Sequence, residues 1–261
     1  MKRFFKDIKK YFSYALYSAK AELKAEISSS YLNWIWWVLE PLSFMFIYMF
    51  IYSIVFQGEQ DQLPLFIFIG LTCWNFFNKC VITSVKLVQN NTSIVSKVYL
   101  PKFILVLEKM LVNGFKMLVS FVLAFVMMPF FGVPFTWKIV FFIPFLLLLL
   151  LFTFGFCCWL MHLGVFVEDL SYIINIALRL VFYATGVFYP IESKLGAPWN
   201  TILLKGNPIA FVIDGLRDAI LYIDQPIDFM FFGIWLVATL LIIWGGIKII
   251  YRYENSYVKV I

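Results

Sequence analysis

The sequence has 261 residues, of which 63% are hydrophobic and only 14% are charged. A soluble domain usually carries about 25% charged residues, and several apolar runs here reach the roughly 20 residues that cross a bilayer as a helix. The composition therefore excludes a soluble single-core protein and predicts an all-α polytopic membrane protein, whose net charge of +6 fits basic cytoplasmic loops and anionic lipid rather than nucleic acid.

Residues 1–31 are predicted to form a cytoplasmic N-terminal amphipathic helix that does not cross the membrane. Apolar residues recur there at three- and four-residue steps, including Phe4, Ala15, Ala19 and Ile27, and lysines fill the other face. This pattern is typical of a helix that lies in the membrane interface, with membrane lipid against its apolar face. A helix that packs on a partner protein is the alternative.

Residues 32–261 are predicted to form one domain with six transmembrane helices. The spans are placed at residues 34–56, 65–85, 103–128, 139–160, 172–189 and 229–250, and the fifth is the shortest. Lysine and arginine are concentrated in the N-terminal segment, between spans two and three, and at the C-terminal end, whereas the first and third connections have none. Because basic residues remain on the cytoplasmic side, both termini are predicted to be cytoplasmic.

The connection between spans five and six, residues 190–228, is then extracytoplasmic. Its apolar parts are too short to cross a bilayer, and its prolines and glycines divide it into two short helices. Asn207 and Pro208 form a helix-start signal, and Arg217 lies on the polar side of the helix that follows. We expect a re-entrant hairpin that caps something polar, with Trp199, Asn207, Pro208 and Arg217 as candidate residues of an outer gate.

Four stretches of the sequence together resemble a known family. They are YLNWIWWVLEPLSFMFIYMFIYSIVF (31–56), FIGLTCWNFFNKCVITSVKLVQNNTSIVSKVYLPKFIL (68–105), VFVEDLSYII (165–174), and FYATGVFYP (182–190) followed by GNPIAFVIDGLRDAIL (206–221). In this order and spacing they are similar to the membrane (permease) subunit of the ABC exporters that move O-antigen, capsule, rhamnan and teichoic acid.

The resemblance implies the partners and the location of the protein. The expected assembly is a homodimer of permease subunits with two separate ATP-binding subunits, in the bacterial cytoplasmic membrane, and the expected substrate is a lipid-linked glycan or polyol-phosphate polymer. ATP and Mg would be held by the partner subunits, and no cofactor is expected in this chain. The sequence agrees, because it contains no G-x-x-x-x-G-K-[ST] motif with which to build a P-loop.

The second cytoplasmic connection, within residues 89–102, is the candidate coupling helix. A membrane subunit needs a rigid cytoplasmic knob that an ATPase can push, and this stretch offers polar capping residues, an apolar edge and a terminating proline. The candidate residues are Asn91, Ile94, Val95, Lys97 and Val98. An ordinary polar loop is the alternative. Glu168 and Asp169 are candidates for a second contact with the ATPase, or Asp169 is simply the N-cap of span five.

Charged and aromatic side chains inside the spans are the candidates for contact with substrate. Glu40 and Arg179 lie well inside spans one and five, where charges usually face a cavity or pair with each other, so a cation that attracts phosphate and a structural Glu40–Arg179 ion pair are both possible. Aromatic rings stack on sugar faces, but they also form interfacial belts. The aromatic candidates for a portal or conduit are Tyr31, Trp34, Trp36, Trp37, Phe182, Tyr183, Phe188 and Tyr189.

Two rival functions remain open at the level of sequence. One is a small-molecule ABC permease of the same superfamily. The other is a membrane enzyme acting on lipid-linked sugars, for which Asp214 and Asp218 are the only candidate carboxylate pair. His162 is the only histidine, so neither a catalytic triad nor a histidine-based metal site is predicted.

Overall fold

The computed structural model describes residues 2–28, 31–58, 60–222 and 225–260, and within these ranges it contains helices and no strand. The helices are α1 (Lys2–Ser28), η1 (Asn33–Ile35), α2 (Trp36–Phe50), η2 (Ile51–Val55), α3 (Leu63–Val85), α4 (Leu87–Asn90), α5 (Thr92–Val95), α6 (Phe103–Phe130), η3 (Trp137–Phe141), α7 (Phe142–Phe166), α8 (Leu170–Ala184), α9 (Ile191–Lys194), α10 (Trp199–Gly206), α11 (Pro208–Ile220), α12 (Phe229–Arg252) and α13 (Glu254–Val260). The all-helical prediction is therefore confirmed.

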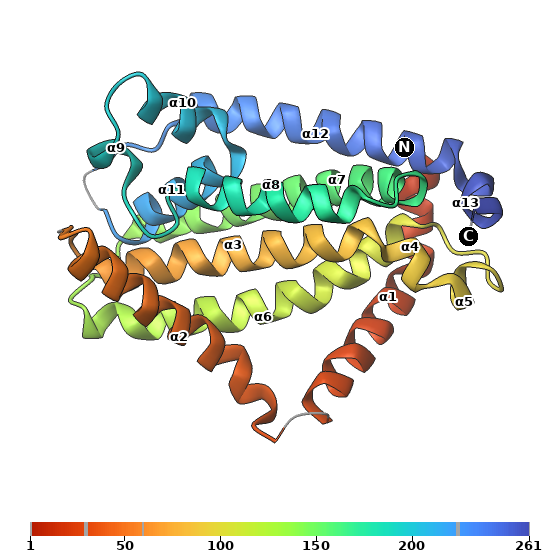
Figure 1. The fold of residues 1–261 in the computed structure, drawn as a ribbon, viewed down its shortest axis with the longest axis horizontal. Coiled ribbons are helices and arrows are strands. Elements are labelled where there is room, and N and C mark those ends of the chain that lie inside the picture. The colour runs from red at the N-terminus through yellow and green to blue at the C-terminus, as the bar shows by residue number, and fades with distance from the viewer. Residues whose placement is uncertain (1, 29–30, 59, 223–224, 261) are drawn as a thin grey trace.

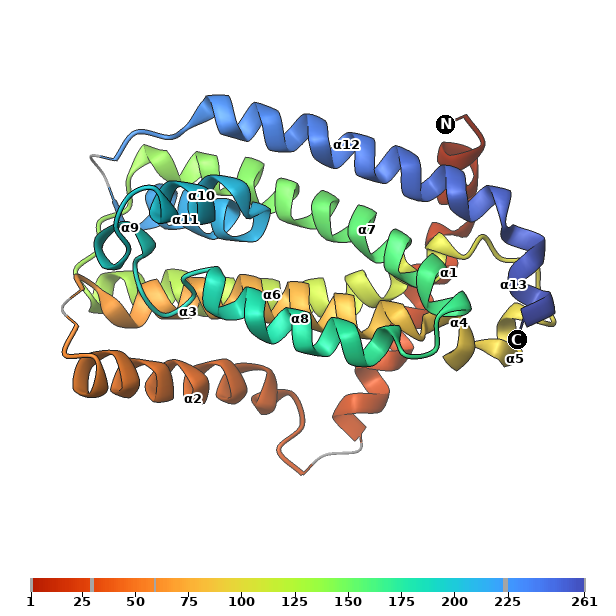
Figure 2. The same ribbon diagram turned by 45° about the horizontal axis from the view of Figure 1, so that its top comes forward.

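Helix α3 lies at the centre of a bundle of long helices. It packs against α6, α7, α2 and α8, and α7 packs in turn against α12 (Figures 1 and 2). Buried apolar side chains follow all faces of α3, which explains why its sequence shows no polar stripe. The start of α1 and helix α13 lie at one end of the bundle, and the short helices α9, α10 and α11 lie at the other (Figure 1). The start of α1 and helix α13 thus lie at the same end of the bundle, and the cytoplasmic location of this end stays a prediction.

Five of the helical segments are long and apolar enough to cross a bilayer. They are Trp36–Val55, Leu63–Val85, Phe103–Phe130, Trp137–Phe166 and Phe229–Arg252. The predicted fifth span is the shorter apolar helix α8, which runs alongside α3 and α7. Its 15 residues extend about 22 Å, less than the roughly 30 Å of a hydrocarbon core. A sixth crossing at α8 therefore stays a prediction.

Helix α1 packs across α6 through a row of polar contacts. Lys109 Nζ lies 2.7 Å from the Glu22 carboxylate, Lys116 Nζ lies 2.6 Å from that of Glu26, and Ser18 donates a hydrogen bond to Glu108. Phe4, Ala15 and Ala19 of the predicted apolar stripe are buried against the bundle. The amphipathic helix is confirmed, but part of its apolar face packs on protein instead of facing lipid.

Arg217 of α11 makes the most hydrogen bonds of the side chains that join the short helices α9, α10 and α11 to the bundle. It is 3% exposed and donates hydrogen bonds to the carbonyl oxygens of Phe66, Gly186 and Val187 at 2.7–3.1 Å. A Cβ atom on Gly70 would lie 2.5 Å from the guanidinium, so only glycine leaves room for it. Gly70, which stands in the second stretch of the family resemblance, is thus required by a close approach.

The predicted helix caps have different outcomes. Asn207 caps α11 as predicted, because its Oδ1 accepts hydrogen bonds from the N–H groups of Ile209 and Ala210. Asp169 stands at the N-cap of α8, but its side chain accepts no backbone N–H bond, so the predicted side-chain cap is wrong. Asn91 is not a side-chain cap either, because its Nδ2 instead donates to the carbonyl oxygen of Leu87.

Candidate functional site

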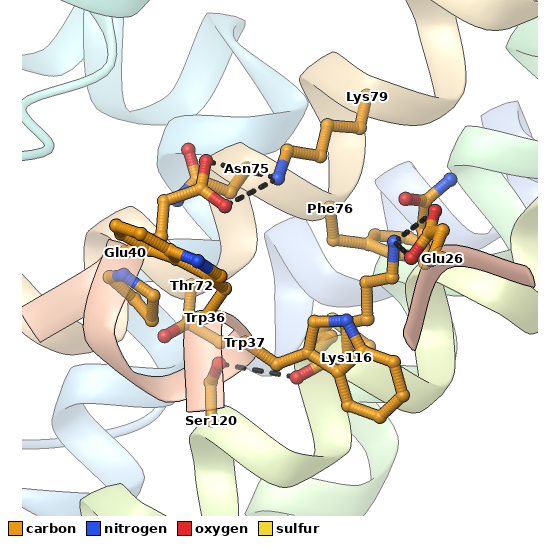
Figure 3. A pocket seen from close by; sticks show the side chains of 13 residues that line it. Glu26, Trp36, Trp37, Glu40, Thr72, Asn75, Phe76, Lys79, Lys116 and Ser120 are labelled. Atoms are coloured by element: carbon orange, nitrogen blue, oxygen red, sulfur yellow. Dashed lines mark hydrogen bonds and ion pairs between the residues drawn. The ribbon is translucent and has the colours of Figure 1, made fainter. Parts of the chain in front are cut away.

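The first polar site is a pocket between α1, α2, α3 and α6, here called the α1–α2 pocket (Figure 3). It has a volume of about 230 Å³ and contains two ion pairs. Glu40 pairs with Lys79 at 3.1 Å, and Glu26 pairs with Lys116. The suggested Glu40–Arg179 pair is wrong, because Lys79 on the neighbouring helix α3 is nearer to the carboxylate of α2. The general expectation that charges within spans pair is confirmed at Glu40.

The α1–α2 pocket combines charged groups with aromatic rings and free hydrogen-bonding groups. Trp36 and Trp37 of α2 point into it beside the ion pairs (Figure 3). Thr72 also lines the pocket, and its buried hydroxyl has no hydrogen-bond partner in the part of the chain that the structure describes. A buried polar group without a hydrogen-bond partner lowers the free energy of unfolding by about 1–3 kcal/mol unless water or a ligand binds it. The α1–α2 pocket therefore combines two ion pairs, two indole rings and one unsatisfied hydroxyl group.

The second polar site is a groove on the other side of α2, between α2, α3 and α8, here called the α2–α8 groove. It has a volume of about 520 Å³ and is lined by Phe44, Tyr48, Leu71, Trp74, Asn75, Asn78, Ile82, Asn175, Leu178, Arg179, Phe182 and Tyr183. Arg179 is exposed, and within the described residues it has no hydrogen-bond or ion-pair partner. Asn75 and Asn78 are likewise unpaired there, and Asn75 lines both the groove and the α1–α2 pocket.

The aromatic candidates divide into packed and available rings. Phe182 is buried against Trp74 and Tyr48, with ring centroids 5.4 and 5.5 Å apart. Phe188 is also buried on Tyr48, at 5.2 Å, so these rings hold α2, α3 and α8 together. Tyr183 is 61% exposed and keeps a free ring face towards the groove.

Three other aromatic candidates lie outside both cavities. Tyr31 and Trp34 are exposed and line neither of them. Tyr189 donates a hydrogen bond from its hydroxyl to the carbonyl oxygen of Tyr183. The two N-terminal rings are thus exposed beside the α1–α2 connection, whereas Tyr189 stiffens the end of α8.

The proposed coupling residues lie together at the end of the bundle that carries the termini (Figure 1). The segment forms two short helices, α4 and α5, rather than one. Val95 is 5% exposed and packs into the core, whereas Lys97 and Val98 are exposed. Glu168 and Asp169, between α7 and α8, are also exposed. Asn91 and Ile94 are half-buried, so Lys97 and Val98 are the exposed members of the five candidate residues.

The outer gate candidates lie at the opposite end. Arg217 faces inward, so any gating role must act through the position of α11, and Trp199 is 64% exposed. A cavity of about 500 Å³ lies beside α11, lined among others by Glu192, Asp214 and Asp218. Loss of hydration raises the pKa of Asp214 to about 6 and that of Asp218 to about 7, with the neighbouring carboxylates adding to the effect.

Sequence reasoning missed the asparagines of the groove. Asn75, Asn78 and Asn175 stand in otherwise apolar helices, and carboxamides at that depth are a usable signal for a polar-lined surface. No group of three or more His, Cys, Asp or Glu side chains able to hold a metal occurs among the described residues.

A bundle of apolar helices with unpaired polar groups facing outward from mid-helix is typical of a membrane transport subunit. The chain belongs to the ABC-2 type transporter family, whose sequence model matches residues 16–221. It is 27% identical to an O-antigen export system permease protein, RfbA, from Myxococcus xanthus, with 85% of each chain covered. Two proteins of the same name from Klebsiella pneumoniae are 24% and 23% identical, with 92% of each chain covered.

Proposed function

We propose that this protein is the permease of an ATP-driven exporter that moves a lipid-linked polysaccharide or a related polyol-phosphate polymer. The α2–α8 groove is the observation that carries the proposal. Arg179, Asn75 and Asn78 have no partner in the described chain, and unpaired polar groups are costly at membrane depth. A second copy of the chain and a hydroxyl-rich polymer passing between the two copies would supply those partners.

The named relatives support the same class of substrate. Each carries O-antigen export in its name, and the similarity extends over most of both chains. A polysaccharide presents hydroxyl groups, which bind carboxamides and guanidinium, and C–H faces, which stack on rings such as Tyr183. A lipid-linked phosphate would first bind near Lys79 and Lys116 in the α1–α2 pocket. Asn75 lines both this pocket and the α2–α8 groove, so it connects the two sites.

Replacement of Arg179 tests this function. In cells that make the polymer, Arg179→Gln should lower export by about tenfold, the cost of one lost charge-assisted hydrogen bond, and lipid-linked polymer should accumulate inside. Arg252→Gln is the matched control, because Arg252 is exposed but lies outside both cavities. Normal export by the Arg179 variant at wild-type protein level would exclude the groove as the path. Accumulation of a small solute instead would favour a different substrate class.

The ATP-binding partner is proposed to dock on the end that carries α4, α5 and the α7–α8 connection, which would then be cytoplasmic. Val98→Asp places a charge on an exposed apolar side chain and should abolish co-purification of the ATP-binding subunit without unfolding the permease. Phe135→Asp changes an equally exposed apolar residue at the opposite end and should leave co-purification unchanged. Loss of the partner from the Phe135 variant, with retention by the Val98 variant, would reverse the orientation.

A further inference from the structure

A third cavity lies between α1, α6 and α7, separate in character from the two polar sites. Its volume is about 630 Å³, and nearly all of its wall is apolar. Leu23 and Ile27 of α1 face Leu111 and Leu118 of α6 across it, and Leu146 and Leu150 of α7 close its far side. Figure 1 shows α1 leaving the bundle at an angle, and the residues that line the cavity come mainly from the facing sides of α1 and α6. A hydrocarbon chain fits a groove of this shape and lining.

Two lysines stand at the rim of this groove. Lys20 and Lys24 line it, both are exposed, and neither has an ion-pair or hydrogen-bond partner within the described residues. They are four residues apart on one helix face, an arrangement that is destabilising for like charges unless an anion lies between them. The acids of the same helix are already engaged, since Glu22 pairs with Lys109 and Glu26 with Lys116.

We propose that the groove between α1 and α6 is a binding site for an anionic phospholipid, with one acyl chain in the apolar cavity and the phosphate between Lys20 and Lys24. The combination of apolar groove and paired ammonium groups matches the two halves of that molecule. A bulk anionic phospholipid fits better than a glycan carrier, because the wall has almost no hydrogen-bonding groups with which to recognise a sugar. The site is independent of the substrate proposed above.

The apolar cavity between α1 and α6 shares a wall with the α1–α2 pocket, so a bound lipid would affect both. Trp37 and Met117 line both the apolar cavity between α1 and α6 and the α1–α2 pocket. An acyl chain in the apolar cavity would therefore contact the side of Trp37 that faces away from the ion pairs. Trp37 otherwise packs edge-on against Phe115, with ring centroids 5.7 Å apart. A bound lipid would therefore fill the apolar cavity and fix the wall that the two cavities share.

Native mass spectrometry of the full-length chain, delipidated and then supplied with one lipid at a time, tests the proposal. The probes are phosphatidylglycerol, phosphatidylcholine with the same acyl chains, and undecaprenyl phosphate. Wild-type protein should retain phosphatidylglycerol over phosphatidylcholine by roughly thirtyfold, the preference expected from two lysines near an anionic headgroup. Equal retention of the two phospholipids, or stronger retention of undecaprenyl phosphate, would overturn it.

Variants locate the site. The double variant Lys20→Glu and Lys24→Glu should lose the preference, whereas Lys6→Glu with Lys9→Glu makes the same charge change on the same helix away from the groove and should keep it. Leu118→Trp should displace the acyl chain while both lysines remain, and retention should fall for both phospholipids. A wild-type preference in the Lys20/Lys24 variant, or unchanged retention in the Leu118 variant, would place the lipid elsewhere.

Discussion

Helices α2 and α3 are both apolar enough to span a bilayer, yet their environments are opposite. In the most apolar part of Leu63–Val85, 78% of the residues are buried inside the bundle, against 17% in Trp36–Val55. Helix α3 is held on every side, whereas α2 meets the bundle between two polar cavities. The hydropathy of a helix indicates that it is stable outside water. It does not indicate whether lipid, the same chain or a second subunit surrounds the helix.

This difference suggests how the work is divided between the two helices. Helix α3 is the frame against which α6, α7, α8 and α11 are fixed, and α2 is the wall that both polar cavities share. Elements with few buried contacts are the ones that open at low free-energy cost. Substitutions that disturb the contacts of α3 should therefore lower the free energy of unfolding, and substitutions that disturb α2 should lower transport.

The largest effect is expected where the frame is anchored. Arg217→Ala removes the guanidinium that satisfies the carbonyl oxygens of Phe66, Gly186 and Val187, and it leaves a cavity against Gly70. We expect a loss of about 3 kcal/mol or more in the free energy of unfolding, and export should fall with it. Thermal unfolding of the purified protein measures the effect.

Two variants separate anchoring from gating at this position. Arg217→Lys keeps the charge but cannot make the same set of hydrogen bonds, so it should also be destabilising. Trp199→Ala changes an exposed ring on α10 and should leave the unfolding temperature unchanged. Wild-type stability of the Arg217→Ala variant together with an open, leaky pore would instead favour a direct gating role.

The Glu40–Lys79 pair joins the wall to the frame, and its removal should affect transport more than stability. Both side chains are more than 40% exposed, so the pair contributes less than about 1 kcal/mol to folding. Glu40→Lys should nevertheless reduce export, because two ammonium groups would repel α2 from α3. The double exchange Glu40→Lys with Lys79→Glu should restore it, and transport assays on the three variants measure the coupling. Failure of the exchange to rescue export would show that the site needs a particular charge at position 40.

The sequence indicates the helical class, the short α8 and the Asn207 cap, because apolar run length, proline and asparagine act locally. The re-entrant course of residues 190–228 stays a prediction. The sequence does not indicate the partner of Glu40, since Lys79 and Arg179 are both basic residues within apolar helices and only packing shows which one is near. The sequence pattern also misplaces Arg217, because a polar residue opposite an apolar stripe is predicted to face solvent. Here the carbonyl oxygens of the neighbouring segments provide the polar surroundings.

The smallest effect concerns pH at α11, at the end of the bundle opposite the start of α1 and outside the membrane-spanning helices. Burial next to Asp214 raises the folded-state pKa of Asp218 to about 7, whereas an unfolded Asp titrates near 4. The folded protein thus binds the proton more tightly, so this contribution to stability is fully present below about pH 4 and is lost as the pH rises towards 7. Asp218→Asn, neutral at every pH, should raise the unfolding temperature by a few degrees at pH 8 and by progressively less at lower pH.

A matched carboxylate with the opposite shift gives the control for this last prediction. Burial alone would raise the pKa of Asp228, but the ion pair with Lys205 at 3.0 Å and the hydrogen bond from the Phe231 N–H outweigh it and lower the pKa. Stability from Asp228 is therefore present at neutral pH and is lost as the pH falls through the lowered pKa. Asp228→Asn should then be destabilising at pH 8, where Asp218→Asn is stabilising. A destabilising effect of Asp218→Asn at pH 8 would show that water in the cavity beside α11 hydrates Asp218, and that α11 is more open to water than its packing indicates.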